Sequence, residues 1–141
     1  MNINKFTIKS QEALQQAQQI AQSFGQQQLE NEHIFKGILE VDENVTPFIL
    51  KKLNVNVELF KKVLDSTIQS FPKVSGGDIM FSREAGTTVN EAEIIAKKMN
   101  DEFVSIEHLI LANFKSKGKA AQILKDQGVT EKGLQAAIDE M

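Results

Sequence analysis

The chain carries the same pattern of residues twice, and through the first half of the pattern the two copies are separated by 75 positions. Phe6-Thr7 corresponds to Phe81-Ser82, and Glu32-His33 corresponds to Glu107-His108. The apolar positions between these pairs return at the same separation: Leu14 with Val89, Ala17 with Ala92, Ala21 with Ala96 and Phe24 with Met99. A fixed period over apolar positions indicates a duplicated supersecondary unit. We therefore expect two copies of one unit that bury a shared core and leave a groove where they meet.

The separation changes only once along the chain. After the loop at residues 40–46 it falls to 74, so that Val55 corresponds to Val129, Asn56 to Thr130, Phe60 to Leu134 and Leu64 to Ile138. A change of one residue inside a loop leaves the register of every helix intact. This location favours a genuine duplication over a chance match.

The first copy contains signals for four helices. Thr7 is the expected N-cap of a helix whose apolar residues recur at spacings of three and four, and Gly25 is its expected end. A second helix is expected at residues 31–39. The third begins at Thr46-Pro47, with Thr46 as cap, and the fourth follows a cap at Asn56.

The second copy repeats these signals after a stretch that contains Pro72, Gly76 and Gly77. Its expected caps are Ser82, Ser105 and Thr130, and a further helix, which holds Ala121, Ile123 and Leu124, ends at Gly128. Strand-like alternation is not sustained anywhere. The prediction is one all-α domain over residues 1–141, with eight helices in two pseudo-twofold-related four-helix repeats: repeat one at 6–70, a linker at 71–80 and repeat two at 81–141.

Composition narrows the class of protein. The absence of cysteine excludes disulfides and thiolate metal sites, and it fits a reducing cytoplasm. The net charge of −3 is spread over interspersed acids and bases, so no basic stripe for nucleic acid is present, and we interpret the lysines at 115, 117 and 119 as a solvated loop. No apolar run of 18 residues and no apolar leader segment occur, which argues against a membrane protein. Without Trp or Tyr, any recognition surface must use Phe, Ile, Leu, Val and Met.

Catalytic and metal-binding patterns are weak. Gly76-Gly77 is followed by Asp78 rather than by the Lys of a phosphate loop, so we expect no ATP or Mg²⁺ to bind this chain. Ser105, His108 and Asp101 form a conceivable nucleophile set, but Ser105 and His108 share a helix start, where Ser105 serves better as a cap, and Asp101 is typical of a solvated loop. The two Glu-His pairs would hold a metal only if they converged. The favoured interpretation places Glu32 and Glu107 in the first turns of their helices, where a carboxylate complements the helix dipole. We predict no catalytic residue and no metal ligand.

Five segments resemble a known family: FTIKSQEAL, ENEHIFKGILEVDENVTPFILKKLNVN, FPKVSGGD, DEFVSIEHLILA and ILKDQGVTEKGLQAAIDEM. Together they cover almost the whole chain, and they are similar to the Clp repeat domain at the N-terminus of the Clp ATPases, most of all to that of ClpB-type disaggregases. The resemblance implies a cytoplasmic binding module without enzymatic activity, which captures apolar segments of unfolded or aggregated polypeptide for an ATPase ring. ATP and Mg²⁺ would belong to the ATPase modules of a longer, hexameric parent, whereas the domain alone would be monomeric. The alternative is an adaptor-docking domain of the ClpA or ClpC type, or a free-standing copy.

The resemblance also implies site residues. Thr7, Asp101 and Glu107 stand where the family carries polar residues that handle substrate. The groove would involve four residues of the second repeat, with Phe81 nearby: Val89, Ala92, Ile95 and His108. Glu91 and His108 depart from the apolar residues usual in the family, which indicates either drift of surface residues or a changed ligand preference. The first helix of the second repeat, where Gly86 and Thr87-Thr88 also differ from the first copy, is the expected place for a particular ligand.

Overall fold

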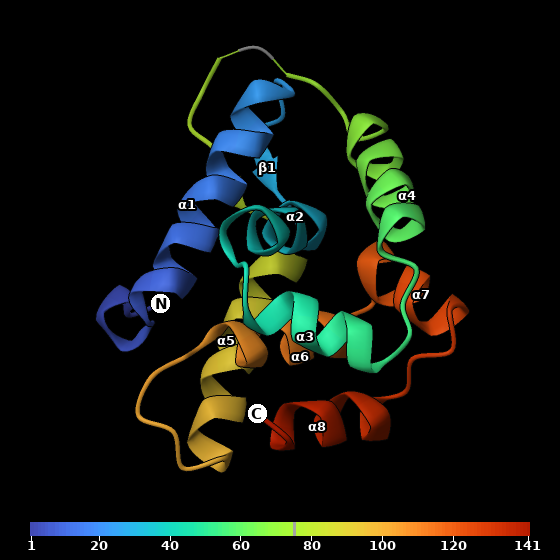
Figure 1. Cartoon of the computed structure of the whole chain (residues 1–141). Coiled ribbons are helices and arrows are strands. Elements are labelled where there is room, and N and C mark those ends of the chain that lie inside the picture. The colour runs from blue at the N-terminus through green and yellow to red at the C-terminus, as the bar shows by residue number, and fades with distance from the viewer. Residues whose placement is uncertain (75) are drawn as a thin grey trace.

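A computed structural model describes residues 1–74 and 76–141, and within them it contains eight α-helices (Figure 1). The all-α prediction is confirmed. The helices are α1 (Ile8–Ser23), α2 (Asn31–Val41), α3 (Val45–Lys52), α4 (Val57–Gln69), α5 (Arg83–Lys98), α6 (Ile106–Lys115), α7 (Lys119–Asp126) and α8 (Glu131–Asp139). A 3-10 turn, η1 (Ile3–Lys5), and two short strands, β1 (Gln28–Leu29) and β2 (Met80–Phe81), complete the elements of the described residues.

The helix ends repeat in the two halves of the chain. Gly25 and Asn100, which follow α1 and α5, have φ angles of +69° and +61°. Asn54 and Gly128, which follow α3 and α7, have φ angles of +57° and +91°. The left-handed backbone needed at a helix end is adopted readily only by Gly and, less readily, by Asn. The duplicated pattern therefore fixes the same turn at equivalent places in both repeats.

The two short strands pair with each other across the two repeats, and we call this arrangement the crossed pairing. β1 of the first repeat pairs in parallel with β2 of the second, with Leu29 opposite Phe81. At the equivalent place, Phe6 of the first repeat pairs in parallel with Val104 of the second. The segment before the first helix of each repeat thus pairs with the segment before the second helix of the other. Sequence patterns missed these pairings because two residues are too few to show an alternation.

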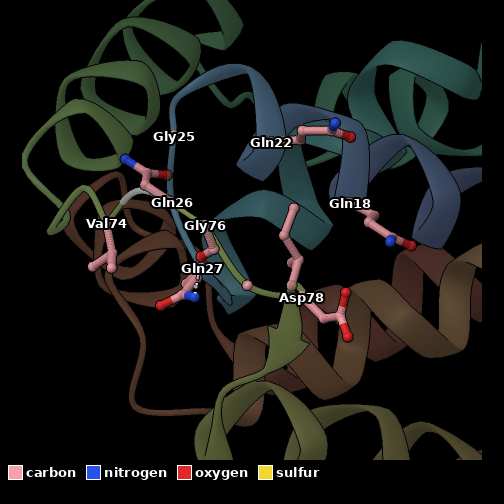
Figure 2. Close-up of a pocket in the computed structure, with 10 residues that line it drawn as sticks. Gln18, Gln22, Gly25, Gln26, Gln27, Val74, Gly76 and Asp78 are labelled. Carbon is pink, nitrogen blue, oxygen red and sulfur yellow. Dashed lines mark hydrogen bonds between the residues drawn. The ribbon is translucent and has the colours of Figure 1, made fainter.

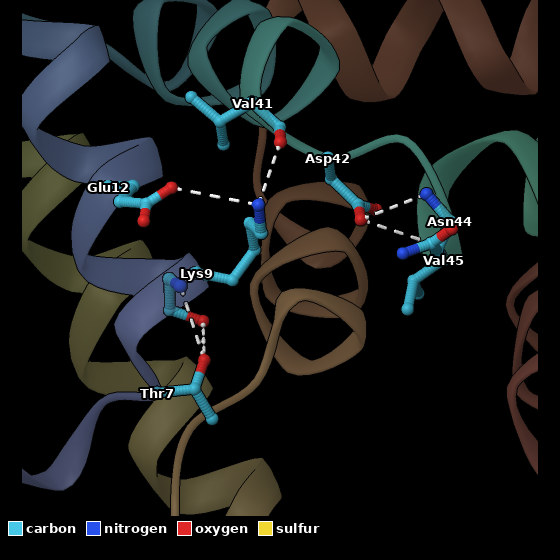
Figure 3. A network of polar contacts seen from close by, with 8 residues as sticks. Thr7, Lys9, Glu12, Val41, Asp42, Asn44 and Val45 are labelled. Carbon is cyan, nitrogen blue, oxygen red and sulfur yellow. Dashed lines mark hydrogen bonds and ion pairs between the residues drawn. The ribbon is translucent and has the colours of Figure 1, made fainter.

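Side-chain caps account for most helix starts. Thr7, Asn56, Ser82 and Thr130 each accept a backbone N–H in the first turn of the helix that follows, at 3.0–3.2 Å, as predicted. At α3 the prediction was wrong, because Thr46 lies inside the helix and is buried. Asp42 holds this helix start instead: its carboxylate accepts the N–H groups of Asn44 and Val45 (Figure 3). It also accepts the N–H group and the hydroxyl of Thr46.

These hydrogen bonds favour the ionised form of the Asp42 carboxyl group. Burial alone would raise the pKa of its carboxyl, but the hydrogen bonds from Thr46, Asn44 and Val45 outweigh burial and hold the pKa below its usual value. A charged carboxylate satisfies three orphan N–H groups at once, which a threonine hydroxyl cannot do.

One core joins both repeats. Its largest fully buried side chains come from both halves and include Phe6, Phe35, Phe60, Leu109 and Leu124. Phe35 of α2 and Phe60 of α4 meet edge to face at 4.9 Å between ring centroids. The segment after α4 then crosses from the end of α4 to the end of α1, where the Val74 N–H donates to the Gly25 carbonyl at 2.9 Å (Figure 1).

Candidate functional site

The expected site residues divide into a buried and an accessible group. Val89, Ala92, Ile95 and His108 are between 0% and 5% exposed, because the apolar stripe of α5 and the start of α6 face the core. As placed, these four support the fold and offer no open surface. Phe81 is 37% exposed, Asp101 is exposed, and Thr7 and Glu107 are half-buried, so these four remain accessible to a ligand.

Phe81 lies in a groove of about 180 Å³, which is lined by apolar residues together with Gln11, Gln15 and Gln18. The groove is formed by the N-terminal turn, α1, β1 and the end of the linker, and its apolar lining consists of Met1, Ile3, Leu14, Leu29, Ile79 and Phe81. Met80, beside Phe81 in β2, is 71% exposed. We call this the Phe81 groove. The family resemblance implies a groove on α5, whereas most of the lining observed here comes from the first repeat and the linker.

Asp101 lies in a neighbouring pocket of about 270 Å³, whose lining includes Asn2, Lys5 and Val104. The turn η1 contributes Ile3 to the Phe81 groove and Lys5 to this pocket, so it separates the two. Thr7 follows η1, and its N–H donates to the Val104 carbonyl at 3.0 Å. The pairing of residues 5–7 with Val104 thus brings Thr7 next to the segment that leads into α6, whose first turn contains Glu107.

His108 bridges two parts of the second repeat. Its Nδ1 accepts the Ser105 backbone N–H at 2.8 Å, and its Nε2 lies 2.8 Å from Asp101 Oδ2. This contact corrects the interpretation of Asp101 as a loop residue that meets only solvent. Because both ring nitrogens are engaged, neither is left to take a proton from the Ser105 hydroxyl, as a nucleophilic triad would require.

The first repeat contains the same arrangement with neutral partners. His33 Nδ1 accepts the Glu30 N–H at 2.8 Å, and His33 Nε2 lies 2.7 Å from Gln26 Oε1. Burial lowers the pKa of His33 from 6.5 to about 4. Since Nδ1 accepts a backbone proton, the neutral ring carries its own proton on Nε2 and donates it to the glutamine. In each repeat, therefore, the histidine uses both ring nitrogens to hold the loop before the second helix in place by hydrogen bonds.

Glu32 and Glu107 have different surroundings although they are equivalent in sequence. Glu32 is buried, and its Oε2 accepts the N–H groups of Lys119 and Ala120 at 2.6 and 3.3 Å, which caps α7 of the other repeat. The sequence suggests a role only in the first turn of its own helix. Glu107 is half-buried in the first turn of α6. Within residues 1–74 and 76–141, no three His, Asp or Glu side chains gather as a metal site would require.

A polar pocket of about 370 Å³ lies where the linker passes α1. Figure 2 shows Gln18 and Gln22 of α1 on one side, Gln26 and Gln27 on the other, and Asp78 below and between the two pairs. The Gln27 side-chain amide donates to the Gly76 carbonyl and so ties the linker to the end of α1. None of the helices in the described part of the chain is long and apolar enough to span a bilayer.

Comparisons with known proteins agree with this fold. Residues 5–127 match the family described as the Clp repeat (R) N-terminal domain. The chaperone protein ClpB of Bacteroides thetaiotaomicron is 50% identical over 141 residues, and that of Porphyromonas gingivalis is 41% identical over 141 residues; each match covers 100% of this chain and 16% of the relative. The chain therefore spans about one sixth of the length of these relatives.

Solved structures show the same architecture at low sequence identity. The N-terminal domain of Hsp104 from Candida albicans superposes with a TM-score of 0.83 at 18% identity, covering 94% of this chain and 88% of that one. The N-terminal domain of ClpD from Arabidopsis thaliana has a TM-score of 0.75 at 20% identity, with 97% and 94% covered. A ClpV N-domain in complex with a VipB peptide has a TM-score of 0.78 at 17% identity, with 94% and 83% covered. From the matched residues and the ClpB relatives together, the chain belongs to the Clp repeat N-terminal domain family.

Proposed function

We propose that this chain is the polypeptide-binding N-terminal domain of a ClpB-like disaggregase and that it holds apolar segments of unfolded or aggregated protein in the Phe81 groove. The observation that carries the proposal is the set of exposed apolar side chains that line this groove, which includes Met1, Ile3 and Phe81 at 64%, 40% and 37% exposure. Contiguous exposed apolar surface on a small domain marks an interaction site. The relatives that are chaperone proteins ClpB favour a non-native polypeptide as the ligand.

The accessible polar residues would contact the backbone of the bound segment. Asp101 and Val104 border the adjoining pocket, the Thr7 N–H donates to the Val104 carbonyl, and Glu107 lies close by in the first turn of α6. Carboxylates and a hydroxyl can accept N–H groups from an extended chain of any sequence. Such contacts add affinity without selecting a particular side chain.

The expected affinity is weak. Burying about 300 Å² of apolar surface gains on the order of 7 kcal/mol at about 25 cal/mol per Å², and association and ordering remove several kcal/mol of it. A dissociation constant on the order of millimolar results. This suits a domain that must release its ligand to the ATPase modules that we expect in a hexameric cytoplasmic parent.

A titration of the ¹⁵N-labelled chain with an unfolded, apolar-rich polypeptide tests the proposal. Amide shifts should gather at residues 1–6 and 79–82, and Phe81→Ser should weaken binding about tenfold, because it removes an aromatic side chain from the groove. Phe48→Ser is the matched control, since Phe48 of α3 is 40% exposed but does not line the groove. Equal binding by the wild-type chain and Phe81→Ser would contradict the proposal.

A second candidate function is docking of a folded adaptor. The complex of a ClpV N-domain with a VipB peptide favours it, since that N-domain of the same fold is paired with one defined partner. A pull-down separates the two functions. One stoichiometric folded protein would favour docking, whereas a heterogeneous mixture that is lost in Phe81→Ser would favour capture of unfolded chains.

A further inference from the structure

The polar pocket of about 370 Å³ beside the linker has a counterpart in the other repeat. This counterpart is the Asp101 pocket of about 270 Å³, because side chains at equivalent positions, 75 residues apart, line the two pockets. Four such pairs are present: Gln18 with Glu93, Gln22 with Lys97, Gln26 with Asp101 and Gln27 with Glu102. The duplicated pattern therefore forms a pocket where the first helix of each repeat ends.

The linings of these two pockets differ in charge. The four paired residues of the Asp101 pocket are all ionisable, whereas those of the polar pocket are all glutamines. A glutamine amide presents two donors and an acceptor without carrying a charge. Asp78 of the linker is the only ionisable residue among the described residues that line the polar pocket. The polar pocket thus offers hydrogen bonds where its counterpart offers ion pairs.

Two of the four glutamine amides are engaged inside the fold. Gln26 donates to the Ile68 carbonyl and contacts His33, and Gln27 donates to the Gly76 carbonyl. Gln18 and Gln22 are exposed, and their side chains make no hydrogen bond within residues 1–74 and 76–141. These two amides are available to a ligand on the side of the pocket that α1 forms (Figure 2).

The polar pocket is continuous with the Phe81 groove, since Gln18 and Ile79 line both. One face of α1 forms a wall of the two together, because the residues that it contributes follow at spacings of three and four: Gln11, Leu14, Gln15, Gln18 and Gln22. This face is about 16 Å long at 1.5 Å per residue. An extended segment of about five residues would cover it.

We propose that the polar pocket is a subsite for the polypeptide held in the Phe81 groove, and that it takes uncharged polar residues such as Gln, Asn and Ser. The inference rests on the proposed function of the groove and names the class of segment that it accepts: apolar residues next to amide or hydroxyl side chains. The amides of Gln18 and Gln22 donate to this polar part and accept from it.

The lining disfavours charged residues of the ligand. An acidic residue would meet the carboxylate of Asp78 and no cation of the described lining. A basic residue would meet Asp78 alone, which is exposed, and an exposed ion pair contributes little to binding. An uncharged polar side chain loses less hydration than either and regains hydrogen bonds from the two amides.

Dissociation constants from titration of the ¹⁵N-labelled chain with tailed peptides test the proposal. The peptides share one apolar segment of six residues and carry no tail or a tail of four Gln/Ser, Glu/Ser or Lys/Ser residues, at either end. We expect the Gln/Ser tail to strengthen binding about tenfold through hydrogen bonds to two amides, and the charged tails to give no gain. The side-chain NH₂ signals of Gln18 and Gln22 should shift with the Gln/Ser tail and not with the untailed peptide.

Gln18→Ala with Gln22→Ala should abolish the gain from the Gln/Ser tail, while the untailed peptide binds as it does to the wild type. Gln19→Ala with Gln69→Ala is the matched control, because both residues are exposed and line neither the pocket nor the groove. This control should keep the gain. Phe81→Ser should weaken binding of every peptide and also keep the gain.

Failure of the Phe81 groove and failure of the polar pocket are therefore distinguishable. The first would appear as equal binding by the wild type and Phe81→Ser, and the second as the absence of a gain from the Gln/Ser tail in the wild type. A gain that survives Gln18→Ala with Gln22→Ala would also overturn the subsite. So would tighter binding of the Lys/Ser tail that disappears in Asp78→Asn, since the pocket would then select basic residues.

Discussion

His33 and His108 occupy equivalent positions, yet they meet different partners. His33 faces the neutral amide of Gln26, whereas His108 faces the carboxylate of Asp101. In both, a backbone N–H fixes Nδ1 as an acceptor. The residue seven positions before the histidine is Gln26 in one repeat and Asp101 in the other. The partner of Nε2 thus changes from a neutral amide to a carboxylate, while the hydrogen-bond geometry stays the same.

The surroundings of His33 predict a loss of stability in acid. Its pKa is lowered to about 4 in the folded chain, against about 6.5 when unfolded, so protons bind preferentially to the unfolded state between these values. The contribution is fully present above about pH 6.5 and is lost as the pH falls towards 4. The shift corresponds to about 3 kcal/mol.

Urea unfolding at pH 7 and pH 4.5, with NMR titration of the imidazole signals, measures this effect. The decrease in free energy of unfolding should be smaller in His33→Gln, which has no ring to protonate. A His33 ring that titrates near pH 6.5 in the folded chain would contradict the prediction.

Among the helices, α1 and α2 depend on one glycine. A Cβ at Gly37 would meet the backbone of Ala13 at 2.5 Å and that of Ala17 at 3.0 Å, and neither backbone atom can move aside as a flexible side chain would. We expect Gly37→Ala to lower the free energy of unfolding by about 2 kcal/mol, because overpacking outweighs the better helix propensity of alanine.

Gly86→Ala on α5 is the matched control in the same unfolding measurement. Nothing lies within 4 Å of a Cβ at Gly86, so this substitution should raise stability by up to about 1 kcal/mol. If both variants were stabilised, close packing at Gly37 would not be what holds α1 against α2.

At the scale of the whole molecule, Glu32 connects the repeats by capping α7 from a distance of almost ninety residues in sequence. We expect Glu32→Gln to lower the free energy of unfolding by about 2 kcal/mol, because it weakens two charge-assisted hydrogen bonds in a buried place. Hydrogen exchange should quicken at the amides of Lys119 and Ala120. Glu107→Gln, at the equivalent and more exposed position, should change stability by less than about 0.5 kcal/mol.

Local signals in the sequence predicted the helices, four side-chain caps and the pseudo-twofold arrangement, because spacing and capping act over a few residues. Local patterns did not predict three other features: the crossed pairing, the Glu32 cap and the path of the linker. Each of them depends on contacts between residues that are distant in sequence. The stripe of Val89, Ala92 and Ile95 shows which face of α5 is apolar but not what covers it.

The crossed pairing of Phe6 with Val104 and of Leu29 with Phe81 makes the two repeats complementary to each other. A single repeat on its own would expose both halves of this pairing, and each half complements the other. Two separate copies would satisfy them by exchanging segments about a twofold axis, which is the self-complementary interface of a symmetric dimer. The present chain holds both halves of this pairing in one polypeptide, so each repeat supplies the segments that the other needs.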